Sequence, residues 1–217
     1  MRINRRVLTL AGCLIALSLL SAGPAGAQVE GTDYRVLSPA RPTQTPGKIE
    51  VLEFFSYACP HCAEFFPVLN SWLATLPKDV VFIRVPVGFG RPPWENLQRA
   101  YYALQASGDL PRLDGALFDA IHQQHLPLFE ESALAYWVRK NGGHPDEFGA
   151  AYTSFGINNL TVAADKMAED DQVDSVPTLV IDGKYVAMGN THAEIITNAG
   201  KLVAKARAEH AAAAKKK

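Results

Sequence analysis

Cysteine is scarce in this sequence: three occur among 217 residues, at positions 13, 59 and 62. No second cysteine pair is present, which excludes a zinc site built from four thiolates. A basic surplus is also missing, because the formal net charge is −1. Nucleic acid is therefore not expected as a partner, since nothing would neutralise its phosphates.

The sequence also lacks an apolar run long enough to cross a bilayer. The apolar segment at 7–20 has 14 residues, whereas a spanning helix needs about 20. Three arginines precede this segment, and the small residues Ala25, Gly26 and Ala27 follow it. This pattern predicts a cleaved secretory signal peptide over 1–27; an uncleaved anchor is the alternative.

Loss of the signal would remove Cys13 and leave Cys59 and Cys62 as the cysteines of the mature chain. Export would place this pair in an oxidising compartment, where disulfides persist. A bridge between residues three apart closes almost no loop, so it would stabilise the fold only slightly. The spacing therefore predicts a disulfide that is made and broken.

The remaining composition, with 48% hydrophobic and 20% charged residues, is that of a globular domain. Residues 49–55 and 80–85 read as buried strands, and 60–76 carries apolar residues at helical spacing. Together they predict a β-α-β unit with parallel strands and a right-handed crossover. Residues 34–37 would form a short edge strand.

Residues 92–170 show no strand pattern. Apolar residues recur there at helical spacing in five stretches, near 94–104, 113–121, 133–138, 145–155 and 160–167. Glycines at 142, 143 and 156 are expected to separate helices. This region is therefore predicted to be an all-helical block.

Strand patterns return at 178–181 and 184–188, separated by an Asp-Gly pair at 182–183 that predicts a β-hairpin. A last amphipathic helix is predicted over 192–208, followed by a frayed tail at 211–217.

The predicted fold is thus α/β, with the helical block inserted into the chain of one sheet. We expect residues 28–91 to form its first part, 92–170 the all-helical insertion, and 171–217 its second part.

The cysteine pair lies where the first strand ends and a helix begins. Pro60 suits the first helical turn, because its missing N–H would have no partner there. Cys59 then occupies the N-cap, where free N–H groups and the positive end of the helix dipole favour a thiolate, the attacking species. His61, if protonated or donating a hydrogen bond, adds to that preference. Cys62, one turn on, is expected to be the less accessible sulfur and to resolve a mixed disulfide.

A stabilised Cys59 thiolate favours the reduced protein, so the disulfide form would be a strong oxidant. The alternative is half of a zinc site, which would need two further ligands. His122 and His125 have helical spacing and could contribute, but we expect both to be surface residues and no metal to be bound.

Glu53 is the other titratable residue that the pattern singles out. It lies in a run that otherwise reads as buried on both faces, and a buried carboxylate is costly unless it is satisfied. We expect an acid of raised pKa beneath the sulfurs that relays a proton to or from Cys62. A solvent-facing position on a half-covered strand is the alternative.

Pro177 stands within a strand-rich run, where proline is restricted to a strand start or a special turn. A cis bond between Val176 and Pro177 would present the Val176 backbone beside the cysteines, for pairing with an extended substrate. Spacing alone leaves the isomer open.

These features together resemble one family. The segment VLEFFS at 51–56, the motif CPHC at 59–62, the Val-Pro pair at 176–177 and the segment DGKY at 182–185 match, in order, the DsbA family of bacterial periplasmic thiol:disulfide oxidoreductases. The resemblance extends over essentially the whole predicted mature chain. It implies a thioredoxin fold with an inserted all-helical domain.

The resemblance also implies roles for individual residues. Cys59 would be the exposed nucleophile, Cys62 its buried partner, His61 a thiolate stabiliser, Glu53 the buried acid and Pro177 a cis proline. The redox-active disulfide would be the only redox group, and no cofactor is expected. A monomer in the periplasm would donate this disulfide to newly exported, unfolded proteins and be reoxidised by the quinone-linked membrane protein DsbB.

Ala58 departs from the family pattern, because an aromatic residue often precedes the first cysteine there; the groove beside Cys59 is expected to be shallower. An isomerase or reductant of the same fold is one alternative, although isomerases of the DsbC type carry an N-terminal dimerisation domain for which residues 28–48 are too few. Another is a binding module, either a metal carrier or a redox-inactive chaperone, whose activity would survive Cys59→Ser.

Overall fold

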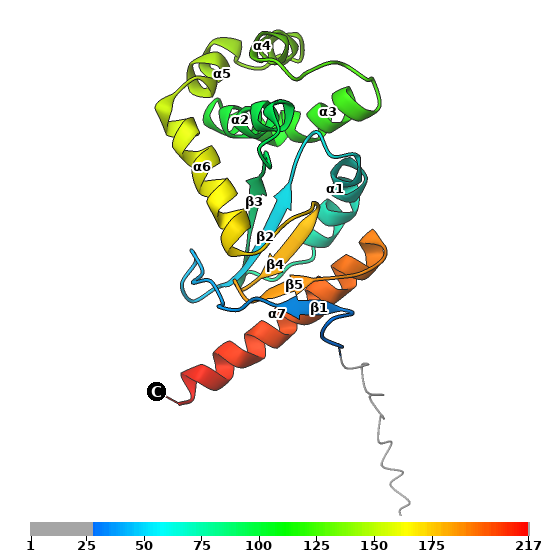
Figure 1. Ribbon diagram of the computed structural model, residues 1–217, viewed down its shortest axis with the longest axis vertical. Coiled ribbons are helices and arrows are strands. Elements are labelled where there is room, and N and C mark those ends of the chain that lie inside the picture. Colours follow the sequence, from blue (N-terminus) through cyan, green and yellow to red (C-terminus); the bar gives the residue numbers. More distant parts are fainter. Residues whose placement is uncertain (1–27, 217) are drawn as a thin grey trace, which may run out of the picture.

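The computed structural model describes residues 28–216, so the predicted signal segment lies outside the described residues. Its centre is a five-stranded sheet with the order β1-β5-β4-β2-β3 (Figure 1). The strands are β1 (Tyr34–Val36), β2 (Ile49–Phe55), β3 (Val80–Pro86), β4 (Thr178–Ile181) and β5 (Tyr185–Ala187). The predicted α/β sheet is confirmed, including its short edge strand.

Strand β2 organises the sheet. All seven of its residues are buried, as its unbroken apolar run predicts. It pairs in parallel with β3 and antiparallel with β4, and the register sets Glu53 opposite Arg84. Helix α1 (Pro60–Leu73) connects β2 to β3 and ends three residues before the predicted position, where a turn leads into β3.

The two faces of the sheet are covered by different helices. Ile49 and Val51 of β2 lie in an apolar cluster with residues of α1 and α7 (His192–Ala214). Leu52 and Phe54, on the opposite face, lie in a cluster with residues of α6 (Phe155–Asp170). The alternation of side chains along the strand therefore gives β2 two cores.

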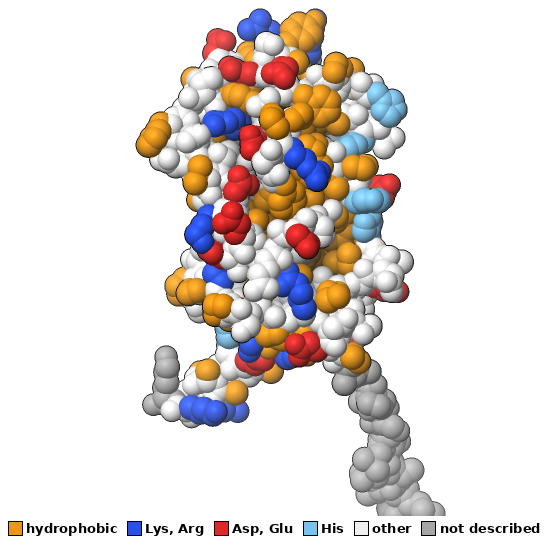
Figure 2. Space-filling view, in the orientation of Figure 1, with side chains coloured by type: hydrophobic (Ala, Val, Ile, Leu, Met, Phe, Trp, Pro, Cys, Tyr) orange, Lys and Arg blue, Asp and Glu red, His pale blue; other side chains and the backbone are white. Residues whose placement is uncertain are grey.

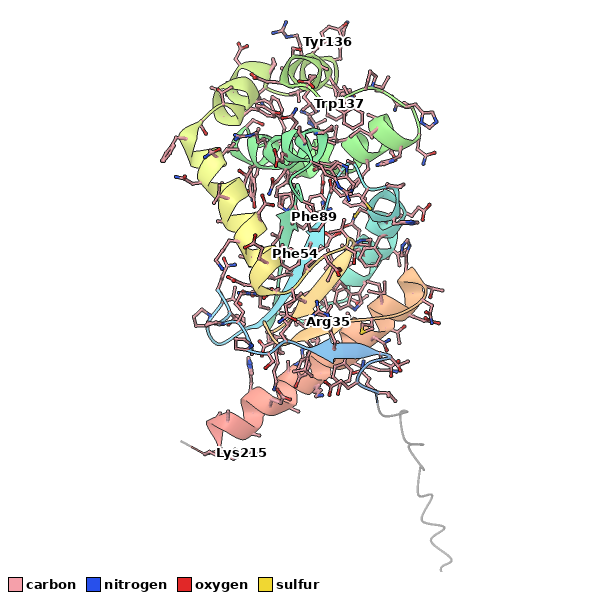
Figure 3. All side chains as sticks on the ribbon, in the orientation of Figure 1. Arg35, Phe54, Phe89, Tyr136, Trp137 and Lys215 are labelled. Atoms are coloured by element: carbon pink, nitrogen blue, oxygen red, sulfur yellow. The ribbon has the colours of Figure 1, made fainter. Side chains whose placement is uncertain are left out.

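Five helices lie between β3 and β4, which confirms the predicted helical insertion. Besides α6 they are α2 (Pro92–Ala106), α3 (Leu110–His122), α4 (Glu131–Lys140) and α5 (Pro145–Tyr152). In Figure 1, α2 to α5 lie beyond the upper end of the sheet, where β2 ends. On α4, Trp137 is buried and Tyr136 is exposed on the outer surface (Figure 3).

Two predicted helix boundaries are wrong. Gly156 does not separate helices but lies in the first turn of α6, whose N-cap Ser154 accepts a hydrogen bond from the Ile157 N–H. Helix α7 continues to Ala214 rather than ending at 208, because its last residues are mostly alanine, the best helix former. Among residues 28–216, no helix is long and apolar enough to span a membrane.

The core of the insertion is continuous with the end of β2. One cluster of buried residues joins Phe55, Tyr57, Cys59 and Cys62 to apolar side chains of α2, α3, α4 and α5. The segment that carries the cysteines is therefore packed from the side of the insertion.

The hairpin predicted from the Asp-Gly pair connects β4 to β5. Asp182 and Gly183 both have positive φ angles, 56° and 59°, and the Ile181 carbonyl accepts a hydrogen bond from the Lys184 N–H. A Cβ atom at Gly183 would lie 2.2 Å from the carbonyl oxygen of Arg41. Only glycine fits this position without displacing the backbone.

We therefore expect Gly183→Ala to lower the free energy of unfolding by about 2–3 kcal/mol, through the positive φ and the clash together. Gly47→Ala is the matched control, because Gly47 also has a positive φ of 78° but no atom within 4 Å of the added Cβ. It should cost only about 1 kcal/mol. Urea unfolding of both variants measures the difference; equal losses would remove the Arg41 contact as its cause.

Candidate active site

The structure places Cys59 at the N-cap of α1, as predicted. Its backbone is extended, with φ −88° and ψ 116°, and Pro60 follows in the first turn. The Cys59 carbonyl accepts hydrogen bonds from the N–H groups of Cys62 and Ala63, at 3.1 and 3.2 Å. The strand end, the N-cap and the first turn thus fix both cysteines in one rigid unit.

Cys59 is more buried than the resemblance implies. The residue is 5% exposed and Cys62 is 0% exposed, so the predicted order of accessibility is confirmed but an exposed nucleophile is not. The reason is packing, since both cysteines belong to the core shared with the insertion.

The pKa values of the two cysteines are shifted in opposite directions. The pKa of Cys59 is lowered to about 6, chiefly because the Cys62 thiol donates a hydrogen bond to its sulfur; burial opposes this, and the N–H groups of Cys62 and His61 and the His61 charge contribute further. Burial, followed by the interaction with Cys59, raises the pKa of Cys62. The negative charge therefore resides on Cys59 and the proton on Cys62.

His61 contributes less to this arrangement than its place in the motif indicates. Its side chain is 72% exposed, and its Nδ1 lies 3.5 Å from a carboxylate oxygen of Glu64. An exposed ion pair of this kind contributes little energy. The thiolate is stabilised mainly by groups that the helix backbone fixes in place.

The loop before β4 lies next to the Cys59 sulfur. The bond between Val176 and Pro177 is cis, as the resemblance implies, and the Val176 carbonyl oxygen lies 3.4 Å from the Cys59 sulfur, where it accepts a hydrogen bond while Cys59 is protonated. A second cis bond, between Ser38 and Pro39, was not predicted. The structure therefore brings Val176 and Cys59 together across 117 residues of sequence.

Glu53 is fully buried, which excludes the solvent-facing alternative. One of its carboxylate oxygens accepts a hydrogen bond from Nε of Arg84 at 2.5 Å, and the other has no partner among residues 28–216. Burial raises the pKa of Glu53, although Arg84 opposes the rise. Its charge in turn contributes to the raised pKa of Cys62, so the two groups are electrostatically coupled.

Arg84 and Asp114 form a charged network with Glu53 that the sequence reading missed. The Arg84 side chain is 9% exposed, and its Nη1 donates hydrogen bonds of 2.8 and 2.6 Å to the two oxygens of Asp114. Its guanidinium carbon lies 3.7 Å from the centre of the Phe55 ring. The available signal was an arginine inside an apolar strand, in register with Glu53; the sequence offers none for Asp114.

The two histidines considered as possible zinc ligands lie in different environments. His122 is half-buried, with its Nε2 2.7 Å from the carbonyl oxygen of Tyr57, so its expected surface position is wrong. His125 is exposed in the loop beyond α3. Among residues 28–216, no group of three or more histidine, cysteine or acidic side chains could hold a metal ion.

A groove of about 700 Å³ starts beside the cysteines and runs between α1 and α3. Pro60, Phe66 and Phe118 are among its apolar lining residues, and His122 also lines it. In Figure 2, orange and pale-blue side chains gather on the right of the molecule, where these two helices lie. Such a groove is wide enough to take apolar side chains of a peptide.

Comparison with known proteins gives consistent results. The model of the DSBA-like thioredoxin domain family matches residues 81–199. The chain is 36% identical over 204 residues to the thiol:disulfide interchange protein DsbA of Bordetella parapertussis, covering 91% of this chain and 95% of the relative. It is 37% identical over 181 residues to DsbA of Pseudomonas aeruginosa PAO1, covering 83% and 85%.

Solved structures agree with this match. The crystal structure of Pseudomonas aeruginosa DsbA superposes with a TM-score of 0.80 at 34% identity, covering 84% of this chain and 96% of that chain. Reduced DsbA1 from Neisseria meningitidis superposes with a TM-score of 0.76 at 29% identity, covering 86% and 99%.

Proposed function

Because this chain belongs to the DsbA family and is a thiol:disulfide oxidoreductase, we propose that it acts as an oxidase that donates the Cys59–Cys62 disulfide to newly exported, unfolded proteins. The observation that carries this proposal is the unequal pair of sulfurs. The lowered pKa of Cys59 favours the reduced state, so the disulfide is readily given away, and the raised pKa of Cys62 keeps the proton on that sulfur.

The transfer proceeds by two thiol–disulfide exchanges. A client thiolate attacks Cys59 of the disulfide; a client–Cys59 bond forms, the Cys59–Cys62 bond breaks, and Cys62 leaves and takes up a proton. A second client thiolate then attacks the client sulfur of this mixed disulfide and releases Cys59 as a thiolate, which its low pKa makes a good leaving group. Two electrons pass from the client dithiol to the enzyme.

The surrounding residues are proposed to serve these two steps. Glu53 exchanges the proton that Cys62 takes up on leaving and gives up on reoxidation. His61 and the helix that Pro60 starts stabilise the Cys59 thiolate. The backbone of Val176, before Pro177, pairs with an extended client, which is supported by its position beside Cys59.

The enzyme must also be returned to its oxidised form. We propose that a DsbB-like, quinone-linked membrane protein accepts the two electrons and that the protein is a periplasmic monomer, exported by the signal at 1–27. No further cofactor is needed, because the disulfide itself carries the electrons. We likewise propose 28–91 and 171–217 as the redox domain and 92–170 as the unit that covers it.

Redox equilibration against glutathione tests the proposed direction of transfer. An oxidase should hold Cys59 and Cys62 mostly as thiols in buffers where thioredoxin is mostly oxidised. A reduction potential near that of thioredoxin would instead favour the reductant or isomerase alternative. Oxidation of a reduced, unfolded client by a stoichiometric amount of the disulfide form completes the test.

Glu53→Gln tests the proton relay. The substitution keeps the shape of the side chain but cannot exchange a proton, so the exchange step in which Cys62 leaves and takes up a proton should slow by about ten- to a hundredfold near neutral pH. Stopped-flow kinetics with a small dithiol across pH 5–9 measures the effect, with the melting temperature as a check on folding. Rates that match the wild type at every pH would remove Glu53 from the mechanism.

A further inference from the structure

Helix α3 of the insertion presents one face to Tyr57, two residues before the nucleophile. Asp114, Phe118 and His122 recur on this helix at four-residue spacing, which places them on one side of it. Asp114 accepts a hydrogen bond from the Tyr57 hydroxyl at 2.6 Å, and His122 Nε2 donates to the Tyr57 carbonyl at 2.7 Å. The Phe118 ring packs edge-on against the Tyr57 ring, with 4.8 Å between centroids.

Asp114 also reaches the buried acid through a shared partner. Arg84 donates Nε to Glu53 and Nη1 to Asp114, so a single guanidinium faces two carboxylates. The Glu53 side chain is 0% exposed and the Asp114 side chain 19% exposed, so water screens this interaction poorly. The negative charge of Asp114 beside Arg84 therefore acts electrostatically on the Glu53 carboxyl.

We propose that Asp114 is a positioning residue for the redox site: it anchors Tyr57 at the start of the catalytic loop and divides Arg84 between two carboxylates, so that Glu53 receives only part of the guanidinium's charge. This role goes beyond the proposed proton relay and rests on that relay only for its effect on rate.

The charged and titratable groups around Glu53 support this assignment. Arg84 of β3 and Asp114 of α3 act on the Glu53 carboxyl, and the charge of Glu53 acts in turn on Cys62 of α1 and Tyr101 of α2. Strand β4 sets the apolar Leu179 opposite Glu53, and Tyr57 of the catalytic loop is bonded to Asp114. Among the causes that act on the pKa of Glu53, Arg84 lowers it, whereas burial, the largest cause, and Asp114 raise it. A neutral residue at 114 would remove one raising charge and leave Arg84 to Glu53 alone.

The test is a titration of Glu53 itself in the reduced protein. With the side-chain carboxyl carbons of glutamate labelled with ¹³C, the resonance that Glu53→Gln removes is that of Glu53. Asp114→Asn keeps the shape and one oxygen that can accept a hydrogen bond from Tyr57, but it removes the charge and one of the two acceptors for Arg84 Nη1. We expect this variant to shift the Glu53 midpoint to lower pH by about one unit. An unchanged or higher midpoint would overturn the proposal.

Tyr57→Phe is the matched control, because it removes the hydroxyl contact to Asp114 and leaves the charge of Asp114 in place. Its Glu53 midpoint should stay close to that of the wild type; a shift as large as in Asp114→Asn would assign the effect to the loop and overturn the role of the charge. Asp114→Ser provides a second neutral variant if Asp114→Asn folds poorly.

Exchange kinetics separate this inference from the proposed function. If Glu53→Gln leaves the rates unchanged, the relay fails, while the midpoint shift in Asp114→Asn can still be observed. If both hold, Asp114→Asn should change the pH profile of exchange in the wild-type background and leave it unchanged in the Glu53→Gln background.

Discussion

Replacing Cys59 by serine is expected to abolish disulfide transfer, with a loss of at least about a thousandfold. Cys59 is the sulfur that carries the negative charge, lies beside Val176 and keeps some exposure, whereas Cys62 is fully buried. Without Cys59 a client thiolate has no sulfur to attack, and serine cannot form the mixed disulfide.

Cys62→Ser is the matched variant with a different expected outcome. Its Cys59 thiolate can still attack a disulfide of an oxidised client: a Cys59–client bond forms, the client disulfide breaks and one client thiolate is released. Without Cys62 to resolve this bond, mixed disulfides should accumulate, whereas Cys59→Ser should form none. Incubation of each variant with a disulfide-containing client, followed by non-reducing electrophoresis, distinguishes the two. Unimpaired activity of Cys59→Ser would favour the alternative of a binding module, such as a redox-inactive chaperone.

The reduced protein is expected to be more stable than the oxidised one at alkaline pH. The pKa of Cys59 falls from 9 when unfolded to about 6 in the fold. Three pKa units correspond to about 4 kcal/mol of stability for the thiolate form. Because the folded pKa is depressed, this contribution is complete above pH 9 and is lost as the pH falls towards 6. The disulfide closes almost no loop and offsets little of it.

Thermal unfolding of both redox forms between pH 5 and 9 measures this difference. At pH 9 the reduced form should melt about 10 °C above the oxidised form, and the gap should close near pH 6. Absorbance of the thiolate at 240 nm locates the titration independently. Cys62→Ala should raise the Cys59 midpoint, because the Cys62 thiol is the largest cause of the lowered pKa. A sulfur that titrates like free cysteine in the unaltered protein would contradict the oxidase assignment.

The sequence predicts well where local pattern decides the structure. The bounds of β2 follow from an apolar run that ends at Phe55, and Cys59 lies at the N-cap because proline comes next. Glu53 could be predicted as buried because both neighbours along the strand are buried too. These positions depend only on residues within one turn or one strand.

The contacts that the sequence does not predict are tertiary. Asp114 and His122 lie on a helix of the insertion, and nothing in their local pattern indicates that Tyr57 lies opposite them. The Cys62 thiol donates a hydrogen bond to the Cys59 sulfur. This bond depends on the burial of the first turn of α1, which the motif does not specify. The exposure of the His61 side chain is likewise a tertiary property that the motif does not specify.

The burial of Cys59 limits what can react with it. At 5% exposure, the residue offers little surface to an approaching client. In a folded client, a cysteine is surrounded by rigidly packed residues. We expect these residues to collide with α1 and the Val176 loop before the two sulfurs reach bonding distance. A cysteine in an unfolded, flexible segment can reach the Cys59 sulfur without such a collision. If the proposed function holds, steric access alone would favour unfolded clients, without any client sequence being recognised.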